Sequence, residues 1–352
     1  MEHINEGAQF ELSVSKGWLA SRLDARFDRD YYFSPRRRDR VDRRCAQLVD
    51  REFGDIGGCF TESNLGRKPF IASDQVLVGG IQPNLILGML VGAEFIAADD
   101  KDADIENHVL AGTPVGALPA PEVLLEHPII RDFDERIAEI RREGRRRPIP
   151  PFFWDTSGRA AIHGTVTTGL KLFGEDLFLD MASRGENTVA ALDWVAEAFS
   201  VLVRHYARSA EFPLMQLHVG ECAGCMIGAD QFARFVLPGL RRLGEELAPI
   251  RLHSCGKSDH LLGVFKKIPR LVSLDLGGET SIKAVRRHFG TEFPVSVAPP
   301  VELLTASDQR PLLDWAEVAL RESENGPLTI VCHLEPGYNV DAVRALARLV
   351  MR

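Results

Sequence analysis

Residues 250–276 read IRLHSCGKSDHLLGVFKKIPRLVSLDL. In this stretch Ile250–Ser254 is a short apolar strand, Ser258–Lys267 has the spacing of an amphipathic helix, and Leu271–Leu276 is a second strand. A strand, a helix and a strand in this order make one unit of a parallel sheet covered by helices. The stretch therefore predicts an α/β fold.

The same alternation extends in both directions from this unit, from Pro151 onward. Further strands are predicted at Ala160–Val166, Leu214–Val219, Phe293–Val297 and Leu328–Cys332. Further helices are predicted at Asn187–Arg208, Asp230–Leu247, Ser281–Phe289 and Asp308–Ser323. One or two more strands from Gly57–Val78 or Phe152–Trp154 would bring the number near eight, so we expect a (β/α)8 TIM barrel.

Residues 1–150 differ from the rest of the chain in their sequence pattern, with runs of charged residues and many turn-forming residues. We expect residues 1–56 to form a helical, loop-rich extension and residues 57–352 to form the barrel. The arginines at 145–147 precede Pro148, and cations at an exposed helix end complement the helix dipole. We assign these arginines no function.

Composition excludes several classes of protein. The 352 residues are 45% hydrophobic and carry a formal net charge of −8, so no positive field attracts nucleic acid or an anionic membrane. The sequence contains no apolar run long enough to cross a bilayer, and its first residues are acidic and polar, unlike a signal peptide. Six cysteines are too few for a disulfide scaffold. We expect a cytoplasmic protein.

A metal site is predicted where two strands end. His253 and Cys255 are two residues apart, so both side chains point to the same side of their strand. Cys332 closes the last predicted strand, and the carboxyl ends of barrel strands form one mouth. One imidazole and two thiolates there would make a three-ligand Zn²⁺ site with a fourth position open, which is typical of a reactive zinc.

Two carboxylates are best positioned to supply the fourth ligand of the metal. Asp275 lies near the end of the strand Leu271–Leu276, and Glu221 follows the strand that ends at Val219. Each of them could bind the metal, orient His253 from behind, or cap a helix. We name Asp275 as a candidate metal ligand and Glu221 as a candidate catalytic residue.

Other polar residues lie near or on predicted strands. Asp155, beside Trp154, and His163 are further catalytic candidates, and a carboxylate beside an aromatic ring would suit a methylated cation. His163 and His218 could line a pocket or be satisfied polar residues. The Cys-x-x-Cys at Cys222–Cys225 suggests a redox pair or a second metal, but only Cys45 and Cys59 remain to complete a four-cysteine site.

The sequence resembles the uroporphyrinogen decarboxylase superfamily, and within it the zinc-dependent corrinoid methyltransferases that act on thiols such as coenzyme M. The resemblance covers roughly residues 150–352. It is carried by Ile162–Gly169 with Leu172-Phe173-Gly174, by Phe232–Pro238, by His253-Ser254-Cys255-Gly256 and by Cys332-His333-Leu334-Glu335-Pro336-Gly337. It implies that His253, Cys255 and Cys332 hold zinc. It also places Asp275 at the acidic position that follows the His-x-Cys pair in related zinc methyltransferases.

The resemblance further implies methyl transfer between a corrinoid carried by a partner protein and a small thiol or methylated substrate. Zinc strips the proton from a thiol, while two cysteine thiolates keep the bound sulfur nucleophilic. A tetrapyrrole decarboxylase is the alternative activity, although the Arg-bearing loop that it needs is not found beside Pro151–Asp155. A non-catalytic zinc module and a homodimeric assembly also remain open.

Overall fold

The computed structural model describes residues 7–56, 74–183 and 185–351. Within these residues, seven parallel strands form one curved sheet in the order β1-β11-β10-β9-β8-β7-β6. The strands are β1 Ala8–Val14, β6 Arg159–His163, β7 Gln216–Gly220, β8 Ile250–Ser254, β9 Leu271–Gly277, β10 Val295–Ala298 and β11 Leu328–Leu334. Two smaller sheets pair β2 Gln75–Leu77 with β5 Arg147–Ile149 and β3 Phe95–Ile96 with β4 Asp104–Ile105.

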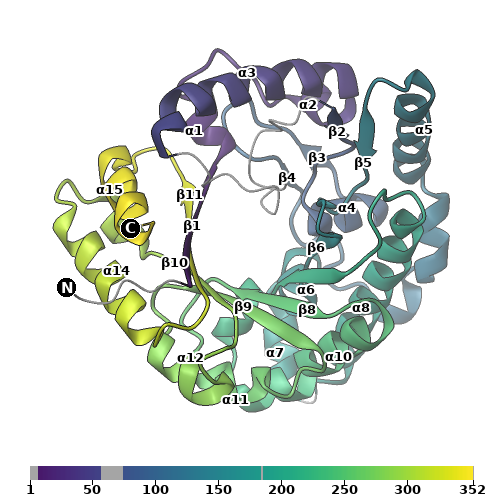
Figure 1. The fold of residues 1–352 in the computed structure, drawn as a ribbon. Helices are drawn as coiled ribbons and strands as arrows, with labels where there is room; N and C mark the ends of the chain where they lie inside the picture. Colours follow the sequence, from purple (N-terminus) through teal and green to yellow (C-terminus); the bar gives the residue numbers. More distant parts are fainter. Residues whose placement is uncertain (1–6, 57–73, 184, 352) are drawn as a thin grey trace.

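Helices surround the curved sheet (Figure 1), which gives the chain an α/β barrel-like fold. In the first half they are α1 Lys16–Ala20, α2 Arg29–Phe33, α3 Pro35–Phe53, α4 Pro83–Leu90, α5 Pro128–Glu143, α6 Thr165–Phe173 and α7 Asp176–Ala182. In the second half they are α8 Glu186–Ala207, α9 Ala229–Gln231, α10 Leu237–Glu246, α11 Leu262–Phe265, α12 Ile282–Phe289, α13 Val301–Thr305, α14 Arg310–Glu322 and α15 Val340–Val350. None of the described helices is long and apolar enough to cross a bilayer.

Local sequence signals explain where several helices begin. The Ser281 hydroxyl accepts a hydrogen bond from the Ala284 amide at the start of α12, and the Asn339 side chain accepts one from the Ala342 amide at the start of α15. Such caps satisfy amides that have no partner inside their own helix. The quoted stretch is confirmed as a β-α-β unit, because β8 has the predicted bounds and β9 extends one residue beyond them.

The main sheet has seven strands in the described residues, close to the expected number, but the described parts of the two segments proposed as extra strands do not belong to it. Phe152–Trp154 is not a strand, because Phe152 and Phe153 have φ values of 73° and 53°, outside the extended region. The segment 74–78 contains β2, but β2 pairs with β5 and not with the main sheet. Residues 57–73 of the other proposed strand region lie outside the described residues.

The strand β1 was not predicted, since it falls within the segment expected to be helical. All seven of its residues pair in parallel with β11, from Ala8 with Leu328 to Val14 with Leu334. Phe10 and Leu12 are buried in the core, and the Ser15 amide donates a 2.9 Å hydrogen bond to the Leu334 carbonyl. Residues 8–14 thus belong to the same sheet as β11.

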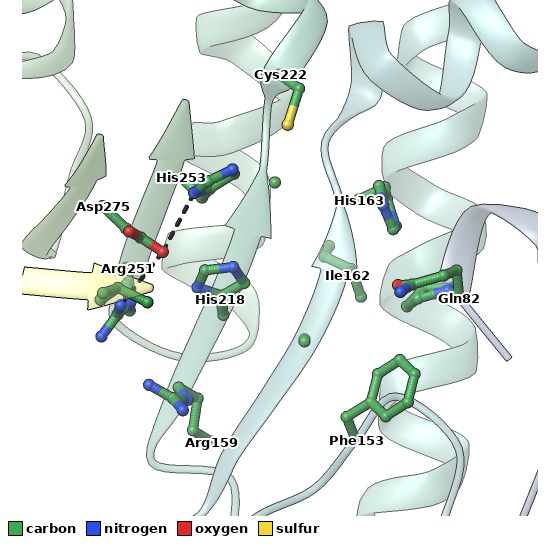
Figure 2. A pocket seen from close by; sticks show the side chains of 14 residues that line it. Gln82, Phe153, Arg159, Ile162, His163, His218, Cys222, Arg251, His253 and Asp275 are labelled. Carbon is green, nitrogen blue, oxygen red and sulfur yellow. Dashed lines mark ion pairs between the residues drawn. The ribbon is translucent and has the colours of Figure 1, made fainter. Parts of the chain in front are cut away.

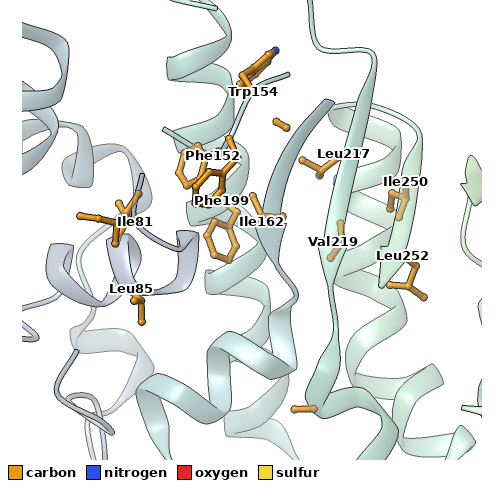
Figure 3. Packing of buried hydrophobic residues seen from close by; sticks show 14 of the residues in the cluster. Ile81, Leu85, Phe152, Trp154, Ile162, Phe199, Leu217, Val219, Ile250 and Leu252 are labelled. Atoms are coloured by element: carbon orange, nitrogen blue, oxygen red, sulfur yellow. The ribbon is translucent and has the colours of Figure 1, made fainter. Parts of the chain in front are cut away.

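The two faces of the sheet have different chemistry. Along β7 and β8, Leu217, Val219, Ile250 and Leu252 are fully buried in the apolar core (Figure 3). The residues between them, which include His218, point to the other face because side chains alternate along a strand. The inner face of the barrel is therefore polar at this place.

Leu12→Ala tests the structural role of β1. We expect it to lower the free energy of unfolding by about 2–5 kcal/mol, because it empties space in a packed core. Gln9→Ala, on the exposed part of the same strand, should change that free energy by less than about 0.5 kcal/mol. Urea unfolding followed by circular dichroism measures both. If Leu12→Ala had the same free energy of unfolding as the parent chain, β1 would not be part of the cooperative core.

Candidate metal centre

Three side chains that can ligate a metal meet at the carboxyl ends of β7 and β8. One ligand atom from each of Cys222, His253 and Cys255 lies within 4.8 Å of the other two. The parallel register places Gly220 opposite His253, and Cys222 follows two residues after Gly220. Neighbouring strands therefore bring the three groups together at the barrel mouth.

The donor set fits zinc. Zinc bonds to sulfur are about 2.3 Å long and those to imidazole nitrogen about 2.0 Å, so tetrahedral ligand atoms stand about 3.5–3.8 Å apart. The three donors need to approach by only about 1 Å to reach such a geometry. Two sulfurs and one nitrogen suit zinc, whereas harder cations such as Mg²⁺ prefer oxygen ligands.

Asp275 lies behind His253. Its Oδ2 is 3.1 Å from Nδ1 of His253 and 3.2 Å from the Arg251 guanidinium (Figure 2). Burial alone would raise the pKa of Asp275, but the charges of Arg251 and His253 hold it well below its usual range. Because Nδ1 faces this carboxylate, Nε2 of His253 is the atom available to a metal. Of the roles considered for Asp275, the structure supports orienting His253 and does not place it in the ligand group.

The two cysteines of the group shift each other's pKa in opposite directions. The Cys222 thiol donates a hydrogen bond to Cys255, and this bond together with His253 lowers the pKa of Cys255. The same bond, with burial, raises the pKa of Cys222. Cys255 is exposed at the mouth, so its sulfur is open to solvent. The lowered pKa favours the thiolate form of Cys255.

A cavity of about 180 Å³ extends from this group into the barrel. His163 and His218, both expected near a pocket, line it (Figure 2). The His218 ring centroid is 5.8 Å from that of His253. Burial and the charge of Arg251 lower the pKa of His218 well below its ordinary value, so this ring is neutral at pH 7. Neutral His218 provides one hydrogen-bond donor and one acceptor to the cavity.

Two arginines line the deeper part of the cavity. Arg159 comes from β6 and Arg251 from β8, and Arg251 also contacts the Ser296 hydroxyl at 3.2 Å. Burial and the charge of Arg251 lower the pKa of Arg159, as expected for two cations in one cavity. Among the described residues, Nε of Arg251 is buried and has no hydrogen-bond partner. This end of the cavity is suited to an anionic group.

Cys332 does not join the group of ligands. Its strand continues to Leu334, so Cys332 is inside β11 and not at its end. The preceding residue, Val331, lines the cavity, and Cys332 points to the opposite face, into the apolar core. Burial raises the pKa of Cys332 to about 12.

Glu221 has a structural role at the start of α6. Oε1 accepts hydrogen bonds from the Thr165 hydroxyl and the Val166 amide, and Oε2 accepts from the amide and the hydroxyl of Thr167, all at 3.1–3.2 Å. A Cβ at Gly164 would lie 2.0 Å from the Glu221 carboxyl carbon, so glycine is required there. Both oxygens of Glu221 are occupied, and the prediction of a catalytic or ligand role is not supported.

Asp155 is buried in the turn before β6. Oδ1 accepts hydrogen bonds from the amides of Ser157 and Arg159 at 2.9 and 3.0 Å and from the Ser157 hydroxyl at 2.5 Å. Its Oδ2 is 3.2 Å from Nε of Arg159. Asp155 precedes the strand, at the opposite end from the metal group, and is not among the cavity-lining residues. It shapes the turn and holds Arg159, and a catalytic role is not supported.

Sequence reasoning did not place Cys222 in the candidate metal group or Arg251 in the cavity. Arg251 could have been found, because it alternates with His253 and Cys255 on the same strand face. Cys222 also had a signal, since its Cys-x-x-Cys follows a predicted strand directly. No comparable sequence signal indicated that Gln82 or Phe153 would line the cavity. Gln82 lies in the first part of the chain, outside the family resemblance, and Phe153 lies in the turn before β6.

Comparison with solved structures shows the same fold in a methyltransferase from Methanosarcina mazei. The two share 17% identity and a TM-score of 0.65 over 99% of this chain and 95% of that chain. A B12-independent methionine synthase from Shewanella sp. W3-18-1, in complex with selenomethionine, aligns at a TM-score of 0.48 and 10% identity, over 99% and 96% of the two chains. No protein-family model and no curated protein matches the sequence. The first likeness confirms the barrel fold expected from the resemblance.

Glu221→Gln separates a structural role from a catalytic one. The amide keeps the shape but turns one acceptor into a donor facing Thr167, so we expect a loss of about 1–3 kcal/mol in the free energy of unfolding. Zinc binding should be unchanged. Urea unfolding and metal analysis check both, with the exposed Glu245→Gln as control. Loss of zinc at unchanged stability would restore Glu221 to the site.

The lowered pKa of Asp275 predicts a pH dependence of stability in metal-free protein. Its folded-state pKa lies below the ordinary 3.8, so its stabilising effect is complete above that value and is lost as pH falls through the folded-state pKa. Stability should therefore decrease less between about pH 5 and pH 3 in Asp275→Asn than in the parent chain. Urea midpoints across this range measure it, with the exposed Asp50→Asn as control. Identical slopes in all three proteins would contradict the assignment.

Proposed function

We propose that this protein is a zinc-dependent methyltransferase that moves a methyl group between a corrinoid carried by a partner protein and a small thiol. The observation that carries the proposal is the group Cys222, His253 and Cys255, backed by Asp275, at the mouth of a barrel. Zinc held there would lower the pKa of a bound thiol and keep its sulfur nucleophilic. The likeness to a methyltransferase fold supports the reaction class.

The residues of this chain have distinct parts in the proposal. Cys222, His253 and Cys255 hold the metal, and Asp275 fixes the orientation of the His253 ring. The two cysteine thiolates reduce the positive charge of the metal, so a bound thiolate keeps electron density for attack on a methyl group. Exposure of Cys255 leaves room at the mouth for a large corrinoid partner.

The cavity favours a small substrate with an anionic group. Its volume of about 180 Å³ is below the range of about 300–1,000 Å³ that is usual for drug-sized ligands, and a tetrapyrrole is larger than those. We therefore favour methyl transfer over the alternative of tetrapyrrole decarboxylation. Arg159 and Arg251 would attract a carboxylate or sulfonate at the far end from the metal.

Free thiols and thiolate ligands suit the reducing cytoplasm, where we place the protein.

Two alanine variants test the proposal directly. We expect the parent chain to bind one zinc and to demethylate methylcobalamin with a small thiol, faster when the thiol carries an anionic group. Cys222→Ala should lose the zinc and at least about 100-fold of the activity, because two protein ligands hold zinc poorly. Cys332→Ala, which removes a thiol pointing away from the cavity, should keep both. Metal analysis and the loss of methylcobalamin absorbance measure these outcomes.

The opposite pattern, with zinc lost in Cys332→Ala and kept in Cys222→Ala, would show that the ligand set implied by family resemblance is correct. Demethylation that survives complete removal of zinc by a chelator would refute the metal-dependent mechanism. Turnover of a porphyrinogen in the presence of the chelator would support the decarboxylase instead.

A further inference from the structure

A second cavity lies between α7, α8 and the segment 110–115. Its volume is about 400 Å³, compared with about 180 Å³ for the cavity beside the metal group, and the two cavities share no lining residue. Sites for small molecules usually have volumes of about 300–1,000 Å³. The second cavity is therefore large enough for a small organic molecule and is separate from the candidate metal centre.

The wall of this cavity is largely apolar. Four of its lining side chains are buried in the hydrophobic core, and they come from three different parts of the chain: Leu110, Phe173 at the end of α6, Leu177 on α7 and Ala191 on α8. An apolar group that leaves water and packs against such side chains gains free energy. The wall is thus suited to the apolar body of a ligand.

The segment that closes the cavity is held at both ends. The Leu110 amide donates a 2.8 Å hydrogen bond to the Leu172 carbonyl, at the end of α6. Further along the chain, Nε1 of Trp194 on α8 donates a 2.8 Å hydrogen bond to the Pro119 carbonyl. Because the wall is already ordered, a ligand does not have to order it on binding.

Two carboxylates of α7 also line the cavity. Asp176 and Asp180 are four residues apart, so they lie on the same face of the helix and repel each other. Oδ2 of Asp180 accepts hydrogen bonds from the amide and the hydroxyl of Thr188, both at 2.8 Å, which fixes its position. No lysine, arginine or histidine is among the described residues that line the cavity. A bound cation would relieve the repulsion between the two carboxylates.

We propose that this cavity binds a small organic ammonium ion. Its apolar body packs against Leu110, Phe173 and Leu177, and its cationic nitrogen lies near Asp176 and Asp180. The carboxylates repel an anion, and a neutral molecule gains only the apolar contacts. The cavity beside the metal group is lined by two arginines, so the two cavities select ligands of opposite charge.

Three probes with the same phenyl body test this choice of charge. Phenethylammonium carries a cation, phenethyl alcohol a neutral hydroxyl and hydrocinnamate an anion. We expect the parent chain to bind the ammonium about ten-fold more tightly than the alcohol, because a charge-assisted hydrogen bond is stronger than a neutral one. The anion should bind more weakly than the alcohol. Isothermal titration calorimetry at about 0.15 M salt measures the three dissociation constants.

Asp176→Asn removes one charge from the cavity and keeps the shape of the side chain. Binding of phenethylammonium should weaken about ten-fold, while binding of phenethyl alcohol should not change. Glu175→Gln is the matched control, because Glu175 is an exposed carboxylate next to Asp176 that does not line the cavity. Its affinity for the ammonium should stay within about two-fold of that of the parent chain, since salt screens an exposed charge.

Ala191→Leu fills the cavity from α8. The larger side chain takes the space of the phenyl body, so the ammonium and the alcohol should both bind at least about ten-fold more weakly. Thermal unfolding verifies that this variant folds. Cys222→Ala should leave the affinity for phenethylammonium unchanged, because Cys222 belongs to the metal group and does not line this cavity.

Charge selection that is lost in Asp176→Asn and kept in Glu175→Gln would support the inference. It would be overturned by equal affinities for the three probes, by no binding of the ammonium, or by binding that Asp176→Asn and Ala191→Leu leave unchanged. Loss of ammonium binding in Cys222→Ala would place the probe at the metal group and would also overturn it. None of these outcomes depends on zinc or on methyl transfer, so the proposed function is tested separately.

Discussion

The pairing of β8 between β7 and β9 is the constraint on which the candidate site depends. In the parallel register, Gly220 lies opposite His253 on one side, and Asp275 lies opposite His253 on the other. The first pairing brings Cys222 to the His-x-Cys segment, and the second provides His253 with its carboxylate partner. A shift of one residue in either register would turn these side chains into the apolar layer, because neighbouring residues on a strand face opposite sides.

Three buried carboxylates show how differently one residue type is used in this barrel. A buried charge is costly unless it is paired or hydrogen-bonded, and each carboxylate meets this condition in its own way. Glu221 is satisfied by the first turn of α6, and Asp155 by its own turn and Arg159. Asp275 is satisfied by Arg251 and His253, and it alone of the three lines the cavity. Its partners connect the metal group to the cationic end of the same cavity.

The first part of the chain adds the edge strand β1 to the main sheet and contributes to the cavity. β1 pairs along its whole length with β11, and Ser13 contacts His333 at 2.9 Å from the facing strand. Gln82 and Pro83, at the start of α4, line the cavity opposite the β8 residues. The shape of the cavity thus depends partly on a segment outside residues 150–352, the part of the chain that carries the family resemblance.

The sequence by itself determined the repeating strand–helix units from β6 to β11 and the His253–Cys255 pair, since both follow from local periodicity. It also predicted that His163 and His218 lie near or on strands and could line a pocket, as they do. Only the tertiary structure shows that Cys222 lies with His253 and Cys255 while Cys332 is buried in the apolar core, and that Asp275 contacts His253 while Glu221 caps a helix. It alone placed β1 in the sheet. The physical reason is that strand length, register and the direction of a side chain depend on contacts between segments that are distant in the chain, which local pattern does not encode.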